Sequence, residues 1–253
     1  MGFPGFLKRT PAGADYEIAL AGSPNTGKST LFNALTGLRQ HTGNWPGKTV
    51  ARAEGFFRYR GSVFKIIDLP GTYSLLACSP EEEVARDYLL FGSPDAVVAV
   101  VDATCLKRHL NLVLQILELT PRVVVCVNLI DEAKRKNMHI DCRSLTEMLG
   151  VPAVAAAARN GFGLDDLLKT VAGVLSGSVP VNPPVLRYSA QVEDAVARLE
   201  PKIKNLLGEI RSTRWLALRL LEEDSRVVAA LEKELAGRMT GPFGSAEGGL
   251  VWA

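Results

Sequence analysis

The stretch "GSPNTGKST", residues 22–30, contains residue types that bind phosphate, and it lies between the apolar run "YEIALA" and "LFNAL", which has helical spacing. It begins with a match to G-x-x-x-x-G-K-[ST] in the required context, at the end of a strand and the start of a helix. In such a loop, backbone N–H groups and the positive helix end face the phosphates. A Gly/Ser turn is the alternative interpretation. The pattern assigns phosphate binding to Gly22, Ser23, Pro24, Asn25, Thr26, Gly27, Lys28, Ser29 and Thr30.

Two side chains of this stretch have separate predicted roles. Lys28 would reach the β- and γ-phosphates of a nucleoside triphosphate and assist its hydrolysis, and the Ser29 hydroxyl would bind Mg²⁺. Gly22 and Gly27 let the backbone approach the phosphates in conformations that other residues avoid. The expected ligand is therefore a nucleotide with Mg²⁺.

A second motif, "DLPG", ends the next strong apolar run. We expect Asp68 to hold the Mg²⁺ shell and the Gly71 N–H to sense a γ-phosphate. Between the two motifs lies the polar segment "HTGNWPGKTV", in which Thr49 would close onto Mg²⁺ and the γ-phosphate in one nucleotide state and leave in the other. A strand end with Asp and Gly, and an ordinary loop threonine, are the alternatives.

A third motif, "NLID", follows the apolar run "RVVVCV" and supplies Asn128 and Asp131. A carboxylate here accepts hydrogen bonds from the two N–H donors on the guanine edge, a pair that adenine lacks, and unpaired buried groups cost about 1 to 3 kcal/mol each. The alternative for Asp131 is a helix N-cap. Because the motifs occur in order, each at a strand end, the sequence favours GTP over ATP.

Apolar runs that alternate with helical stretches predict a mostly parallel sheet covered on both faces, that is, an α/β fold with a P-loop, followed by a small all-α domain. The predicted G domain covers residues 15–175. Prolines in 176–185 indicate a linker. Apolar residues then recur every three or four positions, which predicts a helical domain over 186–240, and residues 241–253 form a Gly-rich tail.

Composition argues against several other classes of protein. The net charge of +2 does not indicate a nucleic-acid or anionic-membrane surface, and the four cysteines lack metal-binding spacing. The apolar runs are shorter than the roughly 20 residues that span a bilayer, so we expect a soluble chain. The three histidines are isolated and mark no Fe²⁺ site.

Five segments, "TGNWPGKTV", "DLPGTYSL", "VVDATCLKRHLNLVLQILEL", "NLIDEAKRKNMHID" and "RWLALRLLEED", resemble the cytosolic N-terminal part of the bacterial ferrous iron transporter FeoB. The resemblance covers about Tyr16 to Leu235. It implies a Ras-like P-loop GTPase (G) domain, a helical domain of the GDP-dissociation-inhibitor type, and a following transmembrane region that moves Fe²⁺. The chain would then be a cytoplasmic fragment of a protein at the inner membrane. Its partner would be that Fe²⁺ permease region, with small accessory transport proteins and further copies of itself as additional partners.

The resemblance also carries over individual residues. Asn25 matches the asparagine associated with potassium binding, and the ion would supply positive charge beside the phosphates. Thr72 follows Gly71 where Ras-like enzymes carry a water-orienting glutamine, so slow hydrolysis is expected. Ala157 replaces the usual serine of the base-contacting loop, while the Ala158 N–H would still reach guanine O6; we expect weaker binding or faster release. Ser23, where many members have asparagine, is a second departure.

Two other functions remain open at this point. A freestanding GTPase of ribosome or tRNA maturation would share every nucleotide motif, although the acidic "LLEED" helix does not resemble an RNA-binding module. A GTP-binding regulatory module with negligible hydrolysis is the second, and Thr72 favours it.

Overall fold

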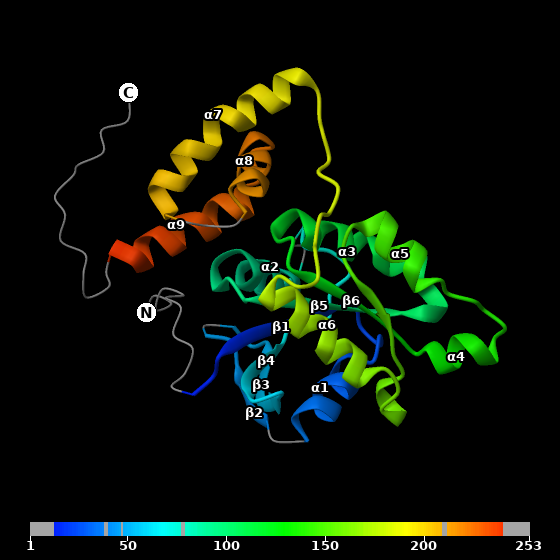
Figure 1. Cartoon of the computed structure of the whole chain (residues 1–253). Coiled ribbons are helices and arrows are strands. Elements are labelled where there is room, and N and C mark those ends of the chain that lie inside the picture. The colour runs from blue at the N-terminus through cyan, green and yellow to red at the C-terminus, as the bar shows by residue number, and fades with distance from the viewer. Residues whose placement is uncertain (1–12, 38–39, 47, 77–78, 209–211, 240–253) are drawn as a thin grey trace, which may run out of the picture. The chain divides into compact units, whose positions relative to one another are not determined.

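The computed structural model describes residues 13–37, 40–46, 48–76, 79–208 and 212–239, so the expected tail lies outside the described part of the chain. The chain divides into two compact units, with the division between Tyr188 and Ser189. The first contains the sheet, and the second is helical (Figure 1).

The first unit is built on a sheet whose seven strands, within the described residues, lie in the order β2-β3-β4-β1-β5-β6-β7. These are β1 (Tyr16–Gly22), β2 (Gln40–Asn44), β3 (Ala51–Tyr59), β4 (Ser62–Asp68), β5 (Ala96–Asp102), β6 (Val123–Asn128) and β7 (Ala153–Ala155). β1 pairs in parallel with β4 and β5, and the parallel part continues through β6 to β7. β2, β3 and β4 pair antiparallel. The prediction of a mostly parallel sheet is thus confirmed.

Helices cover both faces of this sheet, as its almost wholly apolar inner strands require. On one face, side chains of α1 (Lys28–Thr36) and α6 (Leu164–Ser176) form a single buried cluster with residues of β1, β4, β5 and β6. On the other face, α3 (Leu106–Leu119) packs on β5 and β6 (Figure 1). The helices therefore fix the strand ends from which the site loops leave.

The remaining helical segments of this unit are short. They are α2 (Pro80–Asp87), the π-helix η1 (Tyr88–Gly92), the 3₁₀ turn η2 (Ala103–Cys105), α4 (Ile130–Arg135), α5 (Cys142–Leu149) and the 3₁₀ turn η3 (Ala158–Asn160). The start of α2 has a clear local cause: the Ser79 side chain accepts a hydrogen bond from the Glu82 N–H, the Glu82 side chain accepts one from the Ser79 N–H, and Pro80 follows the cap. Three glutamates lie in the first turn of α2, at the helix end that favours negative charge.

Two segments differ from the sequence expectation. Part of the polar segment before Thr49 forms the edge strand β2, whose partner is β3. Backbone pairing holds it there, since an edge strand tolerates exposed polar side chains such as His41 and Thr42. The expected linker is partly tied down: Ser176 ends α6, and the Val179 and Asn182 N–H groups donate to the carbonyls of Gly173 and Gly150.

The second unit consists, in its described part, of α7 (Ala190–Leu207), α8 (Thr213–Leu221) and α9 (Ser225–Met239). Its core includes the Trp215 ring, which is 2% exposed. The Arg214 guanidinium joins α8 to α7 through two hydrogen bonds to the Glu193 carboxylate, at 2.8 and 2.9 Å. Across the described residues of both units, no helix has the length and apolar character needed to cross a membrane.

Candidate functional site

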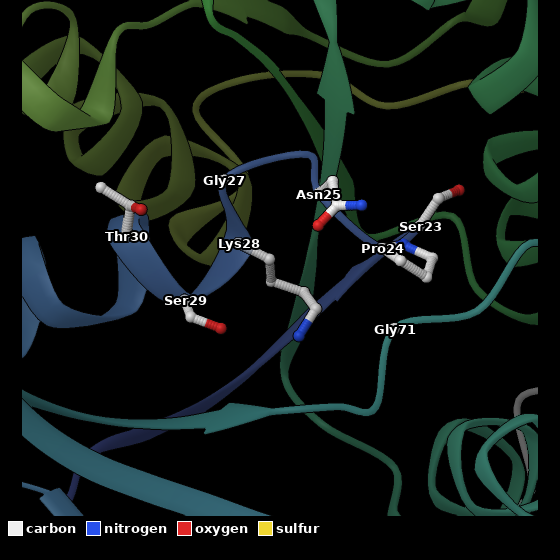
Figure 2. A pocket seen from close by; sticks show the side chains of 8 residues that line it. All are labelled: Ser23, Pro24, Asn25, Gly27, Lys28, Ser29, Thr30 and Gly71. Carbon is white, nitrogen blue, oxygen red and sulfur yellow. The ribbon is translucent and has the colours of Figure 1, made fainter.

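The phosphate loop lies between β1 and α1, at the centre of the sheet where β4 and β5 flank β1. It forms one wall of a cavity of about 500 Å³ (Figure 2). The residues that line this cavity are Ser23, Pro24, Asn25, Gly27, Lys28, Ser29, Thr30 and Gly71. The structure thus brings together most of the phosphate-loop residues predicted from the sequence, and adds Gly71 from the second motif.

Two predicted members of the loop serve its shape instead of lining the cavity. The Thr26 side chain is fully buried, and its hydroxyl donates to the Ser23 carbonyl at 3.0 Å. A Cβ on Gly22 would lie 2.5 Å from the Val100 carbonyl oxygen of β5. Gly22 is therefore needed for close packing of neighbouring strands, a requirement separate from the expected approach to the phosphates.

Gly27 is required for two reasons. Its φ of +79° is in the left-handed region that favours glycine, and a Cβ there would lie 2.3 Å from the Asn128 Nδ2. Close approach to the Asn128 side chain therefore requires a glycine at this position. Asn25 also has a positive φ, of 65°, and its exposed side chain lies at the cavity.

Lys28 and Asp68 form an ion pair at the end of β4. Both side chains are about nine-tenths buried, and the Lys28 ammonium also donates to the Leu69 carbonyl. The Ser29 hydroxyl donates to the other Asp68 oxygen at 3.3 Å. Two of the three residues expected to hold Mg²⁺, Ser29 and Asp68, are thus adjacent, whereas Lys28 is directed to Asp68 and Leu69.

Gly71 lies against the phosphate loop, since a Cβ on it would be 3.2 Å from the Pro24 nitrogen. The next residue, Thr72, is 4% exposed and does not line the cavity. Its hydroxyl donates to the Ser74 carbonyl at 2.6 Å and to a Glu82 carboxylate oxygen at 3.2 Å. The Thr72 side chain therefore stabilises its own segment and the start of α2.

Thr49, a further predicted site residue, is exposed and does not line the cavity. The preceding tryptophan, Trp45, is 3% exposed and packs edge-on against the Tyr88 ring, with the ring centroids 5.3 Å apart. Burial raises the pKa of Tyr88 well above its ordinary value, and the nearby Glu17 carboxylate adds to this effect. The segment that carries Thr49 is thus anchored beside η1.

Asn128 joins the phosphate loop to the loop after β7, which carries Ala158. The side chain is 1% exposed; its Nδ2 donates to the Thr26 carbonyl at 2.9 Å, and its Oδ1 accepts from the Ala158 N–H at 3.0 Å. The Ala158 N–H, which is expected to donate to guanine O6, thus donates to the Asn128 carboxamide in this structure. No local sequence signal indicated this contact, which links positions far apart in the chain.

Asp131 lies in the first turn of α4, while Leu129, with a φ of 60°, is the N-cap. The helix-cap alternative for Asp131 is therefore wrong. The carboxylate is 39% exposed, with an Arg135 nitrogen at 3.8 Å. An accessible acceptor beside the buried Asn128 is the arrangement that recognition of a base edge requires.

The loop after β7 is braced mainly by its backbone. Ala157 is 2% exposed; its N–H donates to the Phe162 carbonyl at 3.0 Å, and the Phe162 N–H donates to the Asn160 side-chain oxygen at 3.1 Å. These contacts, which the sequence did not indicate, support the loop in which a serine hydroxyl is missing. Ser23, the other departure, has a buried hydroxyl without a hydrogen-bond partner among the described residues.

Metal-ligating and nucleophilic side chains are otherwise dispersed. In the described part of the chain, no three His, Cys, Asp or Glu residues are grouped so that they could hold a metal ion. Burial raises the pKa of the Cys126 thiol to about 12, so this cysteine stays protonated and unreactive.

Comparison with known families decides the relationship. Residues 16–171 match the model of ferrous iron transport protein B, and residues 188–240 match that of the FeoB cytosolic helical domain. The chain belongs to the FeoB family. It comprises the family's G domain and its cytosolic helical domain, and the predicted P-loop GTPase-like fold with a helical appendage is confirmed.

Individual relatives agree with this assignment. The Fe(2+) transport protein A/Fe(2+) transporter FeoB fusion protein of Porphyromonas gingivalis is 40% identical over 221 residues, which cover 86% of this chain and 26% of the relative. The chain spans about a quarter of the length of the curated relatives it matches.

Solved structures of FeoB cytosolic domains are similar along nearly the whole chain. That of Thermotoga maritima FeoB in a GDP form is 37% identical, with a TM-score of 0.76, and the match covers 88% of this chain and 87% of that one. The GMPPNP form of the same domain is 36% identical, with a TM-score of 0.73, over 88% of this chain and 92% of that one.

Proposed function

We propose that this chain binds guanine nucleotides and hydrolyses GTP to GDP and phosphate, as the cytosolic regulatory part of a ferrous iron membrane transporter. The observation that carries the proposal is the link between the two halves of the site. Asn128 ties the phosphate loop to the loop beside Asp131 through hydrogen bonds of 2.9 and 3.0 Å. These hydrogen bonds fix the position of the phosphate loop relative to the segment that carries Asp131, the carboxylate proposed to recognise the base. GDP- and GMPPNP-bound relatives of the same fold support this reading.

The residues beside the cavity suit Mg²⁺. A hydroxyl and a carboxylate, from Ser29 and Asp68, lie 3.3 Å apart, and Mg²⁺ prefers oxygen ligands with the remainder supplied by phosphates and water. When bound, the ion would neutralise charge on the phosphate oxygens. The Lys28 ammonium would turn from Asp68 to the phosphates, so that nucleotide binding exchanges one partner of this lysine for another.

Hydrolysis consists of attack by water on the γ-phosphorus and cleavage of its bond to the bridging oxygen, which leaves with GDP. In the proposed mechanism, Lys28 stabilises charge on the phosphates, the Gly71 N–H contacts the γ-phosphate, and Thr49 completes the site when its segment moves. Thr72 offers no help in orienting water, because its hydroxyl is engaged with Ser74 and Glu82. The intrinsic rate is therefore expected to be slow.

We further propose Asn25 as a potassium ligand beside the phosphates. Its exposed carboxamide lies at the cavity, where an ion would add positive charge next to the leaving group. Faster GTP hydrolysis in KCl than in NaCl at matched ionic strength is expected for the wild type and not for Asn25→Ala. Equal rates in the two salts would remove the potassium role and leave the GTPase proposal in place.

At the level of the whole protein, the partner is the Fe²⁺ permease region of the full-length transporter, and the chain acts at the cytoplasmic face of the bacterial inner membrane. Small accessory transport proteins and further copies of the chain are additional proposed partners. Fe²⁺ is the transported cargo, and GTP turnover regulates its passage. Support comes from relatives that are named as Fe(2+) transporters and of which this chain matches about a quarter.

Calorimetric titration with GDP, GMPPNP and ADP in Mg²⁺ buffer tests the binding step. We expect both guanine nucleotides to bind and ADP to bind at least about 100-fold more weakly, since two unpaired polar groups cost several kcal/mol. Lys28→Ala should lose phosphate-dependent affinity, whereas Lys169→Ala, an exposed lysine on α6, should not. Similar affinities for ADP and GDP would contradict the proposal.

A further inference from the structure

The turn that carries Thr49 is closed by two backbone hydrogen bonds. The Trp45 N–H donates to the Val50 carbonyl at 2.9 Å, and the Lys48 N–H donates to the Trp45 carbonyl at 3.0 Å. The conformation of Thr49 is therefore coupled to the positions of Trp45 and Lys48, which lie on either side of the bend.

The Trp45 side chain is the fixed end of this turn. Its ring packs against Tyr88 of η1, and the Arg52 guanidinium lies over it at 5.1 Å from the ring centroid. An indole ring that is 3% exposed contributes a large buried apolar area, and aromatic pairs and cation–π contacts add to it. Displacing Trp45 is therefore costly, and a change in the turn costs less at its partly exposed Lys48 end.

The Lys48 side chain holds that other end through charge. Its ammonium lies 2.5 Å from a Glu83 carboxylate oxygen of α2, and the two side chains are 27% and 33% exposed. A second carboxylate, Asp87, lies one turn further along α2. Burial raises its pKa, and the paired Arg86 guanidinium, more than the Lys48 ammonium, offsets part of this rise. The lysine thus faces an acidic stretch of α2.

We propose that Lys48 is a positioning residue that, by pairing with Glu83, keeps Thr49 away from the phosphate cavity and so disfavours the triphosphate-bound state. The inference rests on the proposed function, in which Thr49 contacts Mg²⁺ and the γ-phosphate. Because Thr49 directly follows Lys48, movement of Thr49 toward the cavity requires the lysine to leave Glu83. A ligand shifts such an equilibrium only by binding the two states differently, and only the γ-phosphate does so here.

The size of the effect follows from the exposure of the pair. Ion pairs exposed to this degree shift an equilibrium by about two- to five-fold, and salt screens them. Removing the pair should therefore strengthen GMPPNP binding by that factor and leave GDP binding unchanged. The ratio of the variant's GMPPNP affinity to that of the wild type should approach one in about 0.5 M salt, where charges are screened over a few Å.

The test is calorimetric titration of GMPPNP and GDP into the wild type, Lys48→Ala, Glu83→Gln and the charge swap Lys48→Glu/Glu83→Lys. Glu83→Gln keeps the helix-forming side chain while it removes the charge. We expect both single variants to raise the GMPPNP-to-GDP affinity ratio two- to five-fold, and the swap and Lys48→Arg to return it to the wild-type value. Arg143→Ala removes an exposed ion pair with Glu147 on α5 and serves as the matched control, with an unchanged ratio.

The outcomes separate this inference from the function on which it rests. An unchanged ratio in both single variants, or a lower one, would overturn the role of Lys48 while guanine nucleotide binding stands. Failure of the charge swap to restore the ratio, or a difference that persists at high salt, would also overturn it, because a merely structural effect would show neither rescue nor screening. Absence of guanine nucleotide binding by the wild type would overturn both.

Discussion

The Asn128 carboxamide donates to the Thr26 carbonyl at 2.9 Å, so a residue of the base motif also fixes the phosphate loop. Asn128→Ala should leave the Thr26 carbonyl and the Ala158 N–H unpaired in a buried place, which lowers the free energy of unfolding by about 2 to 4 kcal/mol. GDP and GMPPNP should both bind more weakly. Urea unfolding and nucleotide titration measure the two effects. The same substitution at Asn111, exposed on α3, is the control, and a fully stable Asn128→Ala protein would contradict the linking role.

Asp131 should set the choice of base. In Asp131→Asn, one acceptor becomes a donor, so the guanine edge loses a partner and a base with an oxygen in place of the amino group gains one. We expect the GDP affinity to fall about 10- to 100-fold and the affinity for xanthosine diphosphate to rise. Glu132→Gln, beside it on α4, should change neither. Unaltered base preference in Asp131→Asn would show that another group reads the base.

Asp68 should couple stability to the bound ion. Asp68→Asn leaves the largely buried Lys28 ammonium without its counter-charge, so the nucleotide-free protein should lose on the order of 3 kcal/mol of stability. GDP should restore much of this, because its phosphates neutralise Lys28, and its affinity should no longer depend on Mg²⁺. Thermal unfolding with and without GDP, in Mg²⁺ and in a chelator, checks both. A Mg²⁺ response like that of the wild type would contradict Asp68 as a ligand.

Ala157 should control how fast the nucleotide leaves. The loop is braced by the Ala157–Phe162 backbone pair and by Asn160, and a serine hydroxyl would add one more brace. In stopped-flow displacement of a fluorescent GDP analogue, Ala157→Ser should slow release by about two- to ten-fold, the effect of one hydrogen bond. Asn160→Ala should accelerate it. Faster release from Ala157→Ser would mean that the buried hydroxyl finds no partner.

Much of the site was predictable because its residues are close together in the sequence or directly follow a strand. The phosphate loop is contiguous, and the positions of Asp68 and Asn128 follow from strands whose carboxyl ends meet at one edge of a parallel sheet. The apolar runs likewise predicted the parallel strands. Local pattern therefore suffices where one strand and the next few residues build the feature.

The rest depended on contacts between distant positions. Lys48 and Glu83 lie 35 residues apart, and Asn128 and Thr26 lie 102 apart. Neither pair has a local signature, so the ion pair beside Thr49 and the hydrogen bond between Asn128 and the phosphate loop were not foreseen. β2 was missed because its polar sequence resembles a loop, and only pairing with β3 makes it a strand.

The most direct test of the central claim is steady-state release of phosphate from GTP, with ATP as the comparison, for the wild type and Lys28→Ala. The account predicts slow multiple turnover with GTP in the wild type, little with ATP, and loss of turnover in Lys28→Ala. Equal turnover of ATP and GTP would contradict guanine recognition by Asp131. Absence of multiple turnover with GTP, in a protein that binds it, would contradict the GTPase and leave a nucleotide-binding module.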